Sequence, residues 1–150
     1  MDKFTGRVWV LGDDIDTDII IPTEYLALKT IDDMKQYGFS PLRPELAGQI
    51  QKGDIIVAGK NFGCGSSREQ APEIIKAMGV QCVIAKSFAR IFFRNSINNG
   101  LLLIEQPNLY DDMKEGDEIT VVMNEHVDYN GKEYPIASLP GNLMSIIQAG

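Results

Sequence analysis

The chain has 150 residues, and its 14 Lys and Arg against 21 Asp and Glu give a formal net charge of −7 at pH 7. A pI near 4.6 without a cluster of basic residues excludes a typical nucleic-acid-binding domain, which gathers Lys and Arg on one face. A hydrophobic fraction of 44% with 23% charged residues is typical of a soluble globular protein. We therefore predict one domain over residues 1–150.

The chain is poor in metal ligands and nucleophiles. Its single histidine, His126, and its two cysteines, Cys64 and Cys82, exclude a Cys₄ or Cys₂His₂ zinc site. Two cysteines without a secretory signal fit a reducing compartment better than a disulfide framework. No apolar run approaches the roughly 18 residues of a membrane span, so we expect a soluble, cytoplasmic protein.

Five short runs rich in Val, Ile and Leu predict strands that are buried on both faces. Two helical segments alternate with them, which favours an α/β fold with a mixed sheet. An Asn-Gly pair at 130–131 predicts a C-terminal β-hairpin, because both turn positions require positive φ. The predicted strands are Arg7–Leu11, Asp54–Ala58, Val80–Ala85, Leu101–Glu105 and Glu118–Met123.

The first strand is followed by four carboxylates within six residues, at positions 13, 14, 16 and 18. A calcium loop is excluded, because Ile19 stands where the turn glycine belongs and Tyr25 where the bidentate glutamate belongs. Two readings remain: a solvated acidic turn, or a cleft lined by one carboxylate. Asp18, beside three isoleucines, is the best candidate for the second.

Residues 23–51 form a weakly patterned stretch with two glycines and two prolines, which we read as a long irregular connection and a candidate functional loop.

The segment 61–69, Asn-Phe-Gly-Cys-Gly-Ser-Ser-Arg-Glu, is the most informative one. Two glycines allow close approach of the backbone, and Ser66, Ser67 and Arg68 meet the expected start of a helix, where unpaired N–H groups attract anions. The pattern is neither a P-loop nor a dinucleotide fingerprint. It predicts either a carboxylate or phosphate site, or a glycine-rich turn with a serine cap.

Two helices are expected between the strands. The first follows Ser66, with a capping box to Glu69, and ends at Gly79; Pro72 must then kink or restart it. The second runs from a cap at Ser87 to the stop at 98–100.

Several further polar residues have an ordinary structural explanation. Arg90 and Arg94 in the second helix are expected at the surface or in ion pairs, with substrate contact as the less favoured alternative. His126 is expected at the surface instead of acting as a base. Cys64 is best explained as a small residue in a tight turn.

Taken together, these motifs resemble the small subunits of 3-isopropylmalate dehydratase, the counterpart of the swivelling C-terminal domain of aconitase. The resemblance covers nearly the whole chain, and the motifs occur in the family's order. It implies an α/β swivelling β/β/α domain of that type. The matching segments are Gly12–Pro22, Tyr25–Leu26, Gly63–Glu69, Ala85–Asn95 and Asn98–Leu102.

The resemblance also implies a cofactor and a partner. In that family a [4Fe–4S] cluster is held by three cysteines of a large subunit, and its free iron polarises the departing hydroxyl. Two cysteines cannot hold such a cluster, so a cluster-bearing large subunit is implied. The implied reaction interconverts 2- and 3-isopropylmalate through 2-isopropylmaleate in leucine biosynthesis, with this chain active only in the two-chain hydro-lyase.

Carried over by position, Ser66 resembles the general base and Arg68 the residue that binds a substrate carboxylate. Ser67 and Asp18 resemble lining residues of the same site. Helix-terminal N–H groups and the guanidinium would stabilise a serine alkoxide.

Substrate choice is implied by the segment at 25–28. In homoaconitase-like relatives an Arg follows the Tyr-Leu pair, whereas here Tyr25 and Leu26 are followed by Ala27 and Leu28. An alkyl substituent suits these side chains better than a third carboxylate. Lys29 leaves homoaconitate open, and citraconate or dimethylmalate hydro-lyases are further alternatives. A non-catalytic module that binds an anion is an alternative from a different class.

Overall fold

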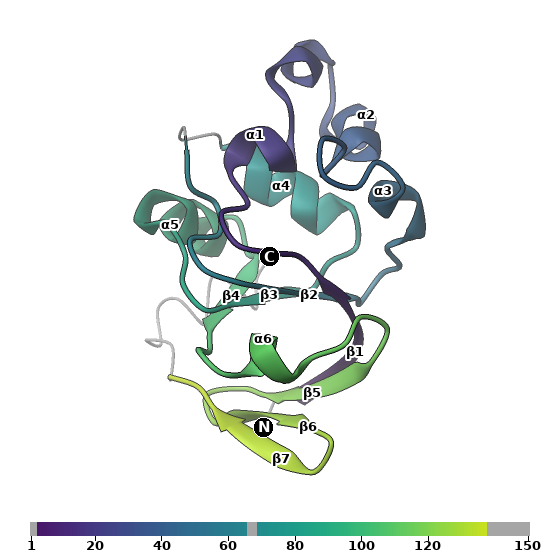
Figure 1. The fold of residues 1–150 in the computed structure, drawn as a ribbon. Coiled ribbons are helices and arrows are strands. Elements are labelled where there is room, and N and C mark those ends of the chain that lie inside the picture. Colours follow the sequence, from purple (N-terminus) through teal and green to yellow (C-terminus); the bar gives the residue numbers. More distant parts are fainter. Residues whose placement is uncertain (1–2, 66–68, 138–150) are drawn as a thin grey trace.

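The computed structural model describes residues 3–65 and 69–137 (Figure 1). In these residues seven strands form one mixed sheet in the order β4-β3-β2-β1-β5-β6-β7, with β1 to β4 parallel and the remainder antiparallel. The strands are β1 (Lys3–Val10), β2 (Ile55–Ala58), β3 (Cys82–Ala85), β4 (Leu102–Glu105), β5 (Glu118–Val122), β6 (His126–Tyr129) and β7 (Lys132–Pro135).

Strand β1 joins the two halves of the sheet. Its residues 3–7 pair antiparallel with β5, and its residues 8–10 pair parallel with β2. The antiparallel strands thereby lie as a separate layer below the parallel ones (Figure 1). A Cβ atom at Gly6 would lie 2.5 Å from the carbonyl oxygen of Gly53 and 2.9 Å from the side chain of Ile55. Glycine is therefore required where β1 passes the chain that enters β2.

Two hydrophobic cores lie on opposite faces of the parallel strands. Alternate side chains of β2 serve each core: Ile55 and Val57 face the antiparallel layer, whereas Ile56 and Ala58 face the helices. All four are fully buried, as are the four residues of β3, which confirms burial on both faces for these two strands. The same prediction is wrong for β5, where buried residues alternate with exposed or partly exposed ones, and for Arg7 in the first half of β1, which is exposed. The three layers confirm the expected β/β/α arrangement.

Most helices cover one face of the parallel strands, and α6 lies between the two strand layers, where Leu109 and Met113 join the second core (Figure 1). The helical elements are α1 (Thr17–Ile20), η1 (Thr23–Ala27), α2 (Ile31–Met34), η2 (Lys35–Tyr37), α3 (Leu46–Gln49), α4 (Gln70–Ala77), α5 (Arg90–Asn98) and α6 (Leu109–Asp112).

The structure corrects three local predictions. Helix α4 begins at Gln70, so Pro72 lies in its first turn, where a missing N–H costs nothing, and neither kinks nor restarts it. Helix α5 begins at Arg90 with Ala89 at its N-cap, so Ser87 is not the cap. Residues 23–51 contain short helical turns and are not irregular throughout. The predicted hairpin is confirmed, with φ of 51° at Asn130 and 79° at Gly131.

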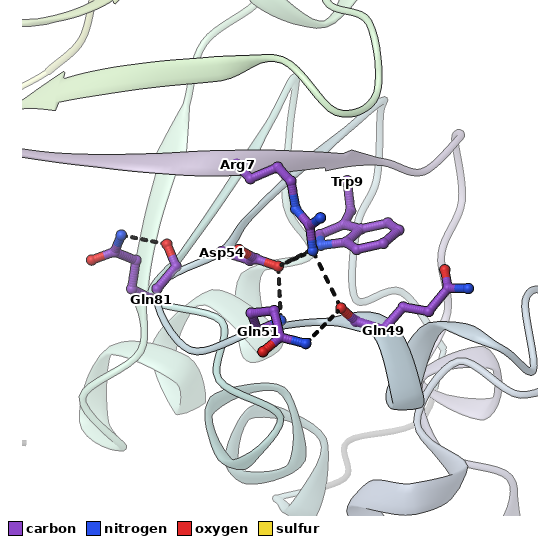
Figure 2. A network of polar contacts seen from close by, with 7 residues as sticks. Arg7, Trp9, Gln49, Gln51, Asp54 and Gln81 are labelled. Atoms are coloured by element: carbon purple, nitrogen blue, oxygen red, sulfur yellow. Dashed lines mark hydrogen bonds and ion pairs between the residues drawn. The ribbon is translucent and has the colours of Figure 1, made fainter.

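A buried carboxylate ties β1 to the start of β2 (Figure 2). Asp54 is 5% exposed and accepts hydrogen bonds from Trp9 Nε1 at 2.8 Å, from the Gln51 backbone N–H at 2.8 Å and from Arg7 Nη2 at 3.2 Å. The Arg7 guanidinium also lies over the Trp9 ring, 4.8 Å from its centroid.

Asp54→Ala is expected to lower the free energy of unfolding by about 2–4 kcal/mol, because donors that lose a partner in a buried site each cost about 1–3 kcal/mol. Urea unfolding of the two proteins measures the difference. Asp111→Ala is the control: it removes a 2.8 Å ion pair with Lys86 whose acid is 59% exposed, and it should cost less than about 1 kcal/mol. Equal losses in the two variants would contradict the assigned role of Asp54.

The β6–β7 hairpin carries a titratable group in the second core. Tyr134 is 3% exposed and donates a 2.6 Å hydrogen bond to Asp112; burial and this bond raise its pKa to about 12. A folded pKa above the unfolded value of about 10 means that stability is fully present below pH 10 and is lost as pH rises toward 12. We expect unfolding by denaturant to become easier across that interval, and Tyr134→Phe to reduce this pH dependence.

Candidate functional site

Three loops meet at the carboxyl ends of the parallel strands, where ligands of α/β proteins commonly bind. They follow β1 (residues 11–16), β2 (59–65) and β3 (86–89). The Gly59 N–H donates to the Gly12 carbonyl at 3.1 Å, and the Lys86 N–H donates to the Gly59 carbonyl at 3.1 Å. The three loops are therefore held side by side by their backbones.

The loop after β2 takes an unusual backbone path. Three of its residues have positive φ: 62° at Asn61, 83° at Gly63 and 95° at Gly65. Within it, the Gly63 N–H donates to the Ile15 carbonyl at 2.7 Å, and the Cys64 carbonyl accepts from the Thr17 N–H at 2.9 Å. Two backbone hydrogen bonds therefore hold the glycine-rich loop against the acidic segment.

Aromatic rings support this loop from beneath. Phe62 is fully buried and makes edge contacts with Phe88 and Phe92, at centroid distances of 5.9 and 5.5 Å. A Cβ atom at Gly63 would lie 2.5 Å from Cδ2 and 2.6 Å from Cβ of Phe92. The rings and the glycine together fix how close the loop lies to α5.

Asp13 and Asp14 are exposed, which agrees with the predicted solvated acidic turn, and most carboxylates of the segment also have hydrogen-bond partners. Asp13 accepts from the Lys60 N–H at 2.7 Å, and Asp14 accepts from the Asn61 side-chain amide at 3.2 Å. Asp16 caps α1 by accepting from the Ile19 N–H at 2.9 Å. Asp18 is exposed in the first turn of α1. The segment positions loops and begins a helix, and Asp18 stays the candidate for the site.

The residues with the leading predicted roles, Ser66, Ser67 and Arg68, lie outside the described residues, together with the predicted capping box. Their neighbours are described: a Cβ atom at Gly65 would lie 3.4 Å from both Asp16 Cβ and Thr17 Oγ1. The chain therefore enters this segment beside the first turn of α1, the turn that carries Asp18.

The residues expected to choose the substrate lie on η1 and its C-cap, one short connection after α1. Tyr25 is half-buried and stacks on Tyr37 with ring centroids 4.0 Å apart. Leu28 packs partly against the helix-side core, whereas Ala27 is exposed. Tyr25 and Leu28 therefore have packing roles, whereas the exposed Ala27 is the one of these three residues that a ligand can contact most directly.

Two residues after β3 were not singled out for the site by the sequence reasoning. Ser87 Oγ accepts from the Asn61 N–H at 2.8 Å and so links two of the loops. Lys86 forms an ion pair with Asp111 at 2.8 Å, and that hydrogen-bonded carboxylate raises the pKa of the Lys86 amine. Both residues directly follow a buried parallel strand, and this position in the sequence could have indicated that they lie near the site.

The two arginines lie at the surface as predicted, whereas His126 is half-buried. Arg90 and Arg94 are exposed on α5, and His126 lies on β6 with a side chain that is 20% exposed. No helix in the described part of the chain is long and apolar enough to cross a membrane.

The thiols do not fit an iron–sulfur cluster. Burial, with Asp16 and Asp14 nearby, raises the pKa of the half-buried Cys64. Cys82 is fully buried in the core between the strand layers, and burial raises its pKa further. A raised pKa disfavours the thiolate form at both cysteines, whereas cluster ligands are thiolates from several cysteines at one place. Cys64 lies between Gly63 and Gly65, which both have positive φ, and its role as a small residue in a tight turn stays a prediction.

Comparisons with known proteins agree with this architecture. Residues 18–109 match the family "Aconitase C-terminal domain". Proteins named 3-isopropylmalate dehydratase small subunit from Lachnospira eligens and Heliobacterium modesticaldum are 76% and 52% identical, each over 99% of this chain and 91% of the relative.

A crystal structure of 3-isopropylmalate dehydratase (LeuD) from Methanocaldococcus jannaschii superposes with a TM-score of 0.92 at 39% identity, over 99% of this chain and 90% of that one. The chain therefore belongs to the family of 3-isopropylmalate dehydratase small subunits, within the proteins that share the aconitase C-terminal domain.

Proposed function

We propose that this chain is the small subunit of a two-chain hydro-lyase that interconverts 2- and 3-isopropylmalate in leucine biosynthesis. The observation that carries this proposal is the identity of 76% over 99% of the chain to a protein named as that subunit. The position of the glycine-rich loop at the carboxyl edge of the parallel strands supports it, because this edge is the usual ligand site of the fold.

The proposed partner is a large subunit that holds the [4Fe–4S] cluster. Two cysteines are too few for the three cluster ligands of that family, and Cys64 lies in the loop after β2 whereas Cys82 is buried in the core between the strand layers. The word "small subunit" in the relatives' names supports a second chain. We expect the assembly to be cytoplasmic and its site to be shared between the chains.

Within this chain, Ser66 is the proposed base. It removes the proton from the carbon beside a carboxylate, the C–H electrons form the double bond, and the hydroxyl group on the adjacent carbon leaves. Arg68 is the proposed partner of a substrate carboxylate, and Ser67 and Asp18 are proposed to line the same site. Donors at the start of the eight-residue α4 and the guanidinium would stabilise the ionised serine.

Substrate preference is proposed to depend on η1. Ala27 is exposed there and Leu28 is half-buried, so these two positions offer a small apolar surface. A branched alkyl substituent is stabilised by such a surface, whereas a carboxylate there would lack a partner. Because Lys29 is an exposed cationic side chain directly after the C-cap, homocitrate is included among the substrates to be tested.

The test is reconstitution. The chain alone is expected to show no turnover, and activity should appear when it is combined anaerobically with a cluster-loaded large subunit. Rates with 2-isopropylmalate, homocitrate, citrate, citramalate and dimethylmalate then rank the substrates, with 2-isopropylmalate expected first. Full activity of the isolated chain would refute the subunit role. A higher kcat/KM for another acid than for 2-isopropylmalate would instead identify the enzyme as the hydro-lyase of that acid.

A non-catalytic anion-binding module is the alternative from another class. Titration of the isolated chain with phosphate and nucleotides separates the two: tight binding without a partner supports the module, and its absence supports the subunit.

A further inference from the structure

The outer face of the β6–β7 hairpin gathers three metal-type ligands far in sequence from the glycine-rich loop. His126 Nε2 lies 3.1 Å from Asp128 Oδ1 and 3.6 Å from Glu133 Oε2. One ligand atom from each of the three residues lies within 4.8 Å of the other two. The side chains of His126 and Asp128 are 20% and 45% exposed, so the group is accessible but not fully solvated.

Strand register explains why these side chains meet. His126 and Asp128 are two residues apart on β6 and share a face, and Asp128 is paired directly with Glu133 on β7. The intervening pair, Val127 and Tyr134, is buried and faces the second core. The three ligands therefore project from the opposite face, from two strands that the hairpin turn holds in fixed register.

This arrangement places two carboxylates directly opposite each other, which destabilises a strand pair unless a cation lies between them. The neighbouring Lys132 is not that cation, because its side chain lies on the core-facing side of the hairpin. There its Nζ is 5.0 Å from the centroid of the Tyr134 ring and 3.7 Å from Asp112 Oδ2. On the adjacent strand β5, the paired residues are Val122 and Thr120, which carry no charge. In the described part of the chain, His126 is the partner of both carboxylates.

We propose that His126, Asp128 and Glu133 bind a divalent transition metal ion of the zinc class, which bridges the two strands. Ligands held about 2.0–2.2 Å from one ion lie roughly 3.0–3.5 Å apart, close to the two distances seen here. An imidazole nitrogen selects zinc, cobalt or nickel over magnesium and calcium, which take oxygen ligands. Three protein ligands leave a coordination position for water.

The experiment uses the full chain without a histidine tag, so that its one imidazole is a unique probe. Titration with ZnCl₂ is followed by ¹⁵N NMR of the imidazole and by calorimetry. We expect saturable 1:1 binding that shifts Nε2, the nitrogen facing the carboxylates, and a rise in thermal midpoint with zinc concentration. MgCl₂ should give no shift.

Three variants test the ligand set. His126→Gln and Glu133→Gln should each weaken zinc binding by at least about tenfold, a loss typical of a disturbed site. Glu133 is 69% exposed, so its variant should fold normally even if His126→Gln does not. The control, Glu125→Gln, removes an exposed carboxylate beside the hairpin that lies outside the ligand group and should bind zinc as the parent does.

Three results would overturn the proposal. One is no saturable binding, which would reduce the cluster to the contacts between the His126 imidazole and the two carboxylates. Another is equal affinity in the parent and Glu133→Gln. The third is a cobalt(II) complex with strong near-ultraviolet thiolate absorption, because that would place the metal at a cysteine.

Discussion

Ser66→Ala is expected to lower the turnover number of the reconstituted two-chain enzyme by about 10²- to 10⁴-fold, the usual contribution of a positioned acid or base. The expected reason is loss of the group that accepts the proton from carbon. KM should change little, because Arg68 and the remaining polar groups still bind the carboxylates. Steady-state rates with 2-isopropylmalate measure both parameters.

Two controls accompany this variant. Ser67→Ala removes the adjacent hydroxyl and should reduce the turnover number far less, since that residue is proposed to line the site without taking the proton. Co-purification of Ser66→Ala with the large subunit and an unchanged urea midpoint would show intact assembly and folding. Turnover that persists in Ser66→Ala, with a lowered unfolding free energy, would instead make Ser66 a helix cap.

Gly63→Ala is expected to lower the free energy of unfolding by about 2–5 kcal/mol. A left-handed backbone costs a residue with a Cβ atom about 1–2 kcal/mol, and overpacking adds about 1–3 kcal/mol. Here φ is +83°, and the new methyl group would overlap the side chain of Phe92. Because Gly63 donates to Ile15 within the site, activity should fall with stability. Urea unfolding measures the loss.

Gly131→Ala is the matched control. Its φ of +79° is nearly the same, yet no atom lies within 4 Å of an added Cβ atom. The hairpin variant should therefore show the backbone cost alone, about 1–2 kcal/mol. Equal losses at the two positions would contradict the close approach of the loop to Phe92.

Much of the architecture was predictable because it is encoded locally. The alternation of buried side chains in β2 and β3 depends on continuous apolar runs, and the turn at Asn130 and Gly131 depends on two residues that tolerate positive φ. The ordered motifs likewise indicated the family, which the comparisons confirmed. None of these inferences required knowledge of distant contacts.

The candidate site was only partly predictable, because its contacts join residues that are far apart in the sequence. Ser87 follows the pattern of a helix cap, but its hydroxyl binds the Asn61 N–H, a contact between residues 26 positions apart that removes it from that role. The carboxylates of Asp13 and Asp14 are exposed, as the sequence indicated, but each also accepts a hydrogen bond from a residue 47 positions away, which the sequence did not indicate. Such partners exist only once parallel strands bring their following loops together.

By itself, then, the sequence determined the strands, the hairpin, the family and a chain too poor in metal ligands for a cluster of its own. The tertiary structure decided where β1 divides between the two strand layers and which loops support the glycine-rich segment. It also decided that His126, expected at the surface, stands between Asp128 and Glu133. The physical reason is that periodicity and φ preferences act within a few residues, whereas hydrogen-bond partners and clustered charges depend on strand register.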